Sequence, residues 1–234
     1  MNGFLENSIV VDPFSIKKYS KIHPVRLGFT VYARALELYA GIVFEKRYLK
    51  YLQPETEAVT GYDSKNTAVT PNQMSAIIHF LKKSCNQCEA EAIVEVGSYR
   101  GVTTTLMASV TKKTVYAVDP FIGYGGAEQD FRYFQDNTSA CKNIVHLRMT
   151  SGEAARGWGR RREVAFAFID AVHDFVNTNH DIEVWSEKLA HGGMLALHDT
   201  DNKNFSGTRL AVANASKRLE LLCHIPDLVI FGKA

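Results

Sequence analysis

A glycine-containing turn follows an apolar run near the middle of the chain. The run Ala92–Val96 leads into Gly97-Ser-Tyr-Arg-Gly101, and a helical pattern begins at Val102. Glycine lets the backbone approach a ligand where a side chain would collide, and a helix N-terminus offers free N–H groups with a partial positive charge. The glycine spacing differs from the dinucleotide fingerprint GxGxxG, which disfavours an NAD site. The segment therefore predicts a binding loop suited to a carboxylate.

An acidic residue, Asp119, ends the next apolar run, Thr114–Val118. It lies about two dozen residues beyond Gly97, near the spacing at which an acid accepts hydrogen bonds from the hydroxyls of a ribose. Taken separately, the glycines could form a plain turn and Asp119 could cap a helix. Their occurrence on consecutive strand ends favours a cofactor that contains a ribose.

Three more polar residues follow two later apolar runs. Asp170 ends the run Val164–Ile169, and His198 and Asp199 end the run Gly193–Leu197. In an open parallel sheet the carboxyl ends of the strands face one crevice. Two or three oxygen ligands there suit Mg²⁺, which keeps several waters and can take the hydroxyls of a substrate. Such a metal would lower the pKa of a bound hydroxyl, so the pattern predicts a divalent-metal site.

The elements that must position these residues alternate regularly from Thr70 onward. Thr70 is predicted to cap a helix that has Pro71 in its first position. Continuously apolar strands separated by helices are typical of a parallel sheet covered on both faces. Pro226 and Asp227 lie between the last two apolar runs and predict a hairpin. Besides the strands above, strands are predicted at 144–149, 219–223 and 228–231, and helices at 102–111, 180–189 and 208–218.

Composition limits the class of protein. The 234 residues suffice for one sizeable α/β core, so residues 70–234 are predicted as one domain and residues 1–69 as an N-terminal extension. The net charge of +2 gives no argument for a nucleic-acid or membrane partner. The amphipathic helix predicted at about Leu27–Leu52 carries several charges and does not match a spanning helix. Without a signal-peptide pattern, and with Cys85 and Cys88 as a lone CxxC, we expect a cytoplasmic protein with reduced thiols.

The motifs together resemble those of the class I S-adenosylmethionine (SAM) methyltransferases, which have a Rossmann-like α/β fold. Their finer pattern is similar to the metal-dependent O-methyltransferases, in particular the group of macrolide-sugar O-methyltransferases and cephalosporin-hydroxylase-like proteins. The resemblance implies a mostly parallel seven-stranded sheet with a C-terminal antiparallel hairpin and an N-terminal helical lid. It runs from about Thr70 to the C-terminus and is carried by Glu95-Val-Gly-Ser-Tyr-Arg-Gly101, Val118-Asp-Pro120, Phe168-Ile-Asp-Ala-Val-His173, Gly192-Gly-Met-Leu-Ala-Leu-His-Asp199 and Asn204-Phe-Ser-Gly-Thr-Arg-Leu-Ala-Val212.

The resemblance also implies the cofactor contacts. Glu95 and Gly97 are expected along the methionine part of SAM, Thr103 near its carboxylate, and Asp119 on the ribose. Residues after the third strand are expected at the adenine, with Phe121 or Trp158 stacked on the ring. The full set of cofactor-binding residues implied is Glu95, Gly97, Ser98, Tyr99, Gly101, Thr103, Asp119, Ser151, Gly152 and Asp170.

The same resemblance implies the chemistry. His173 matches the position of a general base, and a neutral imidazole can accept a substrate proton at physiological pH. Asp170, His198 and Asp199 match the metal ligands, although the family commonly has a carboxylate at the place of His198. Imidazole favours Zn, Fe, Mn or Ni over Mg, so three alternatives stay open: another metal, a His198 that supports the ligands from behind, or no metal. A surface histidine that caps the next helix is the alternative for His173.

The expected function is SAM-dependent methyl transfer to a hydroxyl of a small molecule such as a sugar or polyketide-type metabolite, assisted by Mg or Mn. Two alternatives are a hydroxylase-like enzyme of the same fold that uses a redox metal, and a non-catalytic SAM-binding protein. Tyr62–Pro71 and the glycine-rich stretch 123–126 are predicted to cover the site. Because N-terminal segments of this family often form dimer contacts, a homo-oligomer is left open.

Overall fold

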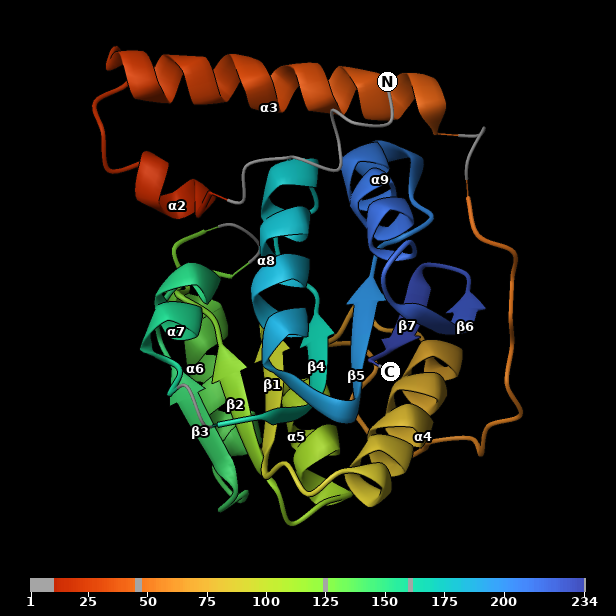
Figure 1. Ribbon diagram of the computed structural model, residues 1–234. Coiled ribbons are helices and arrows are strands. Elements are labelled where there is room, and N and C mark those ends of the chain that lie inside the picture. Colours follow the sequence, from red (N-terminus) through yellow and green to blue (C-terminus); the bar gives the residue numbers. More distant parts are fainter. Residues whose placement is uncertain (1–10, 45–47, 124–125, 160–161, 234) are drawn as a thin grey trace.

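A mixed sheet forms the centre of the computed structural model, which describes residues 11–44, 48–123, 126–159 and 162–233. In the described residues it has seven strands in the order β3-β2-β1-β4-β5-β7-β6 (Figure 1). β1 to β5 pair in parallel, whereas β7 runs antiparallel to β5 and to β6. The predicted sheet with its C-terminal hairpin is confirmed. The strands are β1 (Ala92–Val96), β2 (Thr114–Val118), β3 (Ile144–Leu147), β4 (Val164–Ile169), β5 (Leu189–His198), β6 (Glu220–Ile225) and β7 (Leu228–Gly232).

Helices cover both faces of the sheet and enclose two large apolar cores, beside a small third cluster of Ala117, Phe121 and Phe134 in the described residues. One core contains residues of α3, α7, α8 and α9, and the other contains residues of α4 and α5. β1 and β4 are buried along their whole length because they contribute to both cores, as expected for parallel strands. The helices are α2 (Pro13–Ile16), α3 (Pro24–Val43), α4 (Pro71–Gln87), α5 (Val102–Ser109), α6 (Glu128–Thr138), α7 (Ser151–Gly157), α8 (Phe175–Lys188) and α9 (Ser206–Ala215), with a 3₁₀ turn η1 at Lys203–Phe205.

Caps explain where several helices begin. The predicted start of α4 is confirmed: the Thr70 hydroxyl accepts from the Gln73 N–H, and the Gln73 side chain accepts from the Thr70 N–H. α8 begins five residues before the predicted start at His180, because the Asp174 side chain accepts from the Asn177 N–H at 2.8 Å. α6 and α7 were not predicted. α6 is a mostly polar helix, and its weak apolar pattern gave no signal.

The N-terminal helices pack on the same core as the sheet. α3 lies across α8 and α9 at the end of the molecule where the carboxyl ends of β4 and β5 point (Figure 1), and it buries Leu36 and Ala40. The helix predicted at Leu27–Leu52 starts three residues earlier and ends at Val43. Further along the chain, Leu52 forms an isolated antiparallel β-bridge with His224 of β6. None of the helices in the described parts of the chain is long and apolar enough to cross a membrane.

Candidate active site

A cavity of about 700 Å³ opens at the carboxyl ends of β1, β2, β4 and β5. This volume falls within the usual range of small-molecule sites, and the strand ends are where α/β sheets bind ligands. Most of the predicted site residues line it, and Gly101 and His198 do not. The predicted residues that line it are Glu95, Gly97, Ser98, Tyr99, Thr103, Asp119, Ser151, Gly152, Asp170, His173 and Asp199.

The two glycines of the turn are required by the protein's own packing. Both have positive φ, 87° at Gly97 and 75° at Gly101. A Cβ on Gly97 would overlap the carbonyl oxygen of Asp170, and one on Gly101 would lie 2.9 Å from the side chains of Phe134 and Thr138. Gly101, which was predicted to contact a ligand, does not line the cavity: it begins α5 and lets α6 approach, because only glycine combines this φ with this space.

Asp119 organises the turn through backbone contacts. Its Oδ2 accepts from the N–H groups of Ser98 and Tyr99, both at 3.1 Å, and its Oδ1 accepts from the N–H of Phe121 at 2.8 Å. Burial raises the pKa of the Asp119 carboxyl, and these three N–H groups and the nearby His146 oppose part of the rise. The carboxylate thus holds two strand ends together and still lines the cavity with its remaining lone pairs.

Polar groups without protein partners face the same turn. Burial raises the pKa of Glu95 to about 8, although the Thr104 hydroxyl donates to its carboxylate. The hydroxyl of Ser98 is buried and has no hydrogen-bond partner among the described residues. At the start of α5, Gly101 provides no side-chain cap, so the first N–H groups of this helix are left for other acceptors. A buried carboxyl beside unpaired donors can recognise a ligand that carries both charges.

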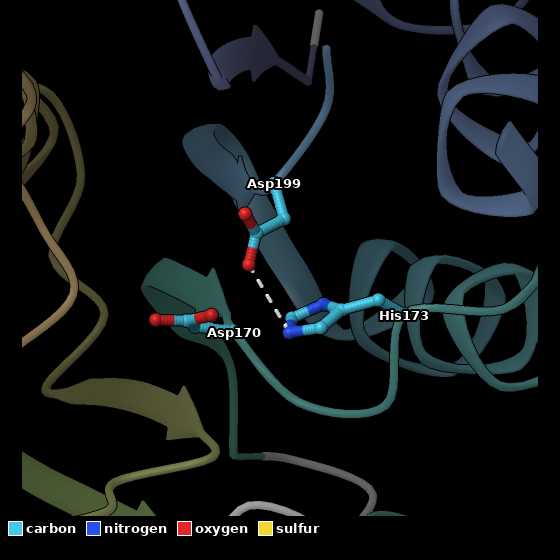
Figure 2. Close-up of side chains that lie close together, drawn as sticks. All are labelled: Asp170, His173 and Asp199. Carbon is cyan, nitrogen blue, oxygen red and sulfur yellow. Dashed lines mark ion pairs between the residues drawn. The ribbon is translucent and has the colours of Figure 1, made fainter. Parts of the chain in front are cut away.

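Asp170, His173 and Asp199 form a compact cluster on the cavity wall (Figure 2). Asp170 directly follows β4, His173 comes three residues later, and Asp199 directly follows β5 with a φ of 53°. One ligand atom from each lies within 4.8 Å of the others, and His173 Nε2 is 3.1 Å from Asp199 Oδ2. Burial would raise the pKa of Asp199, but the two neighbouring histidines outweigh it and lower the pKa. The cluster can hold a cation or accept a proton.

His198, which was predicted as a metal ligand, is not part of this cluster and does not line the cavity. Only 5% of its surface is exposed, and its Nδ1 lies behind the carboxylates, 3.3 Å from Asp170 Oδ1 and 3.4 Å from Asp199 Oδ2. Neither contact has hydrogen-bond alignment, so both are ion pairs. Burial alone would lower the pKa of His198, but the two carboxylates outweigh it and raise it to about 10.

The two aromatic residues expected on adenine lie elsewhere. Phe121 packs among the side chains of α6, and Trp158 packs edge-on against Trp185, so neither lines the cavity. Trp185, which Trp158 contacts, donates from Nε1 to the hydroxyl of Ser151 at 2.9 Å and so fixes the position of this cavity residue.

Residues of the two segments predicted to cover the site line the cavity, and part of the cavity wall was not predicted. Asn66 and Thr67, from the predicted Tyr62–Pro71 segment, line the cavity, as does Gly126, whereas positions 124 and 125 lie outside the described residues. Asp12 also lines it and pairs with Arg156 at 2.6 Å. The Asp12-Pro13 sequence indicates a helix start, but no local pattern indicates a contact across more than 140 residues.

Comparisons with known proteins agree with this geometry. Residues 94–200 match the family described as a methyltransferase domain. The solved structure of the O-methyltransferase NovP matches with a TM-score of 0.58 at 17% identity, covering 88% of this chain and 99% of that chain. The N-methyltransferase NodS from Bradyrhizobium japonicum WM9, in complex with S-adenosyl-L-homocysteine, gives 0.52 at 13% identity, covering 86% and 97%. An rRNA methylase from Streptococcus thermophilus gives 0.52 at 19% identity, covering 68% and 95%.

At these sequence identities the structural similarity shows only the fold. The fold does not indicate which kind of molecule is methylated, since the three proteins are named as an O-methyltransferase, an N-methyltransferase and an rRNA methylase. The family match runs from within β1 to the residue after Asp199. It therefore includes the turn after β1, the carboxylate after β2 and the cluster after β4 and β5. The chain thus has the Rossmann-like α/β fold, and its residues 94–200 match a methyltransferase domain.

Proposed function

We propose that the enzyme transfers the methyl group of SAM to a hydroxyl oxygen of a small molecule, with a divalent metal and His173 as the general base. The observation that carries this proposal is the Asp170–His173–Asp199 cluster, which shares one cavity with the turn after β1. A hydroxyl is a weak nucleophile at neutral pH, so its methylation benefits from a base and a cation in a way that transfer to an amine does not.

The proposed SAM site combines the turn and the groups that face it. The ammonium and carboxylate of the methionine part suit the buried Glu95 carboxyl and the free N–H groups at the start of α5, with Thr103 in its first turn. The unpartnered Ser98 hydroxyl supplies a further contact, and Gly97 and Tyr99 line the same turn. Asp119 keeps lone pairs for the ribose. Ser151 and Gly152, at the start of α7, are assigned to the adenine end.

The donor set fits a divalent cation. Asp170 and Asp199 each offer a carboxylate oxygen, and His173 offers an imidazole nitrogen. Carboxylates suit both Mg²⁺ and Mn²⁺. In the proposed site the two carboxylates hold the metal, which leaves His173 for the proton. When bound, the metal supplies a positive charge that lowers the pKa of a hydroxyl next to it.

His173 takes the hydroxyl proton in this proposal. Its Nε2 lies 3.1 Å from Asp199 Oδ2, so this carboxylate can stabilise the imidazolium that forms when the ring takes up a proton. The ring of Phe205 packs on His173 with the ring centres 4.6 Å apart, which limits its rotation. The oxygen attacks the methyl carbon, the carbon–sulfur electron pair stays on sulfur, and the imidazole of His173 receives the proton. In-line transfer then depends mostly on how the acceptor is held.

The segment before α4 is proposed as a cover over this site. Asn66 Oδ1 accepts from Arg100 Nη1 at 2.6 Å, and Arg100 itself pairs with Asp130 at 2.8 Å. Thr67 lies 3.5 Å from Thr103, oxygen to oxygen. These contacts join the segment to the turn that is assigned to SAM. Limited proteolysis should cut at 61–69 more slowly with SAM present, and equal rates would contradict a cover.

Calorimetric titration of chelator-treated protein with SAM, alone and with Mg²⁺ or Mn²⁺, tests the proposal. We expect SAM binding in the wild type, and metal uptake that is lost in Asp170→Ala but kept in Asp136→Ala, an exposed control on α6. His173→Ala should abolish formation of S-adenosyl-L-homocysteine from hydroxylated acceptors while SAM binding stays near normal. His191→Ala, at the opposite end of the sheet, is its control. Full turnover by His173→Ala would refute the proposed base.

A further inference from the structure

Gln73 connects the first helix of the domain to the wall of the active site. It is 5% exposed, although it lies in the first turn of α4 and lines no part of the cavity. Its Oε1 accepts from the Thr70 N–H at 2.7 Å and lies 3.1 Å from Nε2 of His198. Its Nε2 donates to the carbonyl oxygen of Pro226 at 2.8 Å. A polar side chain with this many buried contacts is held in one orientation.

The contacts fix which atom of each group faces the other. Because a backbone N–H can only donate and a carbonyl oxygen can only accept, the amide of Gln73 must point Oε1 toward Thr70 and Nε2 toward Pro226. Oε1 can only accept, so Nε2 of His198 carries a hydrogen and donates to it. The imidazole ring is therefore held from one side by Gln73. Its other nitrogen, Nδ1, lies between the carboxylates of Asp170 and Asp199.

We propose that Gln73 is a positioning residue: through His198 it sets the separation and orientation of the Asp170 and Asp199 carboxylates. The inference rests on the proposed role of these two carboxylates as the cation-binding pair. Gln73 touches neither the cavity nor the cluster, so it acts only through the imidazole ring. Residues that orient ligands in this way commonly change metal affinity by about 10–100-fold when they are removed.

The loop that carries Asp199 needs such support. Asp199 is a non-glycine residue in the left-handed region, with a φ of 53°, a conformation that persists where the surroundings determine it. Downstream, Tyr48 donates to the carbonyl oxygen of Thr200 at 2.8 Å, and Asp201 exchanges two hydrogen bonds with Asp227 at 3.0 Å. Upstream, His198 is held by Gln73. The left-handed residue is thus anchored on both sides.

Three variants separate positioning from helix capping. Gln73→Met keeps a similar volume and loses the contact with His198, together with half of the capping box. Thr70→Ala loses the other half, because the Gln73 N–H loses its acceptor, and leaves the His198 contact intact. Gln73→Glu keeps an acceptor for both Thr70 and His198 and serves as the rescue variant. Gln73→Asn, which withdraws the amide by one methylene, replaces Gln73→Met if that protein does not fold.

Two measurements on the full chain read the outcome without an acceptor molecule. Binding of Mn²⁺ alone, followed by electron paramagnetic resonance, reports on the carboxylate pair. Long-range proton–nitrogen NMR spectra of the histidine rings report the protonation and the surroundings of each ring nitrogen of His198. We expect Gln73→Met to weaken Mn²⁺ binding about 10–100-fold and to shift the His198 ring signals. Thr70→Ala should change neither, and Gln73→Glu should restore most of the affinity.

The two measurements also separate this inference from the proposed function. An unchanged His198 spectrum in Gln73→Met overturns the inference, whether or not Mn²⁺ binds. A shifted spectrum with unchanged Mn²⁺ affinity also overturns it, because the ring then does not position the carboxylates. Absence of Mn²⁺ binding in the wild type removes the cation-binding role of the carboxylates and the inference that rests on it. In that case the His198 spectrum still shows whether Gln73 holds the ring.

Discussion

Replacing Asp119 should destabilise the fold and also weaken the binding of a ribose. In Asp119→Asn one of the two carboxylate oxygens becomes an NH₂ group. The least costly rotamer keeps the amide oxygen on the Ser98 and Tyr99 N–H groups and turns the NH₂ toward the Phe121 N–H. One hydrogen bond to a charged acceptor, worth about 1.5–3 kcal/mol, is then lost, and the other two become weaker. Because burial raises the pKa of Asp119, removal of the buried charge recovers part of the lost stability.

We therefore expect Asp119→Asn to lower the free energy of unfolding by about 2 kcal/mol. Asp119→Ala should cost more, because three N–H groups are left without an acceptor in a site that is 8% exposed. Urea unfolding followed by circular dichroism measures both. Asp63→Asn is the control: Asp63 also accepts from a backbone N–H, but in an exposed turn, and it should be nearly neutral.

The result that would refute this reasoning is an Asp119→Asn protein with wild-type unfolding free energy and no affinity for SAM. The carboxylate would then serve only the ligand. If both quantities fall together, loss of SAM binding in Asp119→Ala cannot be attributed to the ribose contact alone, since the turn itself has changed.

Three further predictions concern stability. Between pH 4.5 and about 8 the folded protein keeps the proton of Glu95, whereas the unfolded chain releases it. The free energy of unfolding should therefore fall as the pH rises through this range, by at most about 5 kcal/mol. Glu95→Gln should flatten the pH profile of urea unfolding. Gly101→Ala should lower the free energy of unfolding by at least about 1–2 kcal/mol, because position 101 has a positive φ. The folded variant should bind SAM as the wild type does. A variant with unchanged stability and lost SAM affinity would contradict this prediction. Tyr48→Phe should cost about 1 kcal/mol in urea unfolding, since the carbonyl oxygen of Thr200 loses its donor, and a neutral effect would contradict the anchoring of that loop.

Local patterns in the sequence were sufficient for the sheet and for most of the turn after β1. β1, β2 and β4 have the predicted bounds, because strands in the middle of a parallel sheet are mostly apolar on both faces and stand out between helices. The hairpin at Pro226 and Asp227 follows from turn-forming residues between two apolar runs, and Asp227 does adopt a positive φ of 58°. β5, predicted at Gly193–Leu197, runs from Leu189 to His198, since the polar His191 and two glycines hide its beginning.

Which polar residues meet in the site was decided by the tertiary structure. His198 and Asp199 are adjacent in the sequence, yet only Asp199 faces the cavity, and His173 takes the place expected for His198. Gly101 was predicted from the sequence as a ligand-binding glycine, whereas in the structure α6 packs against it. Asp12 reaches the edge of the cavity from the far end of the chain. The strands and the turn could be predicted from the sequence, because they depend on residues close together in the chain. The choice of partners depended on side-chain directions and on long-range packing, which no local pattern contains.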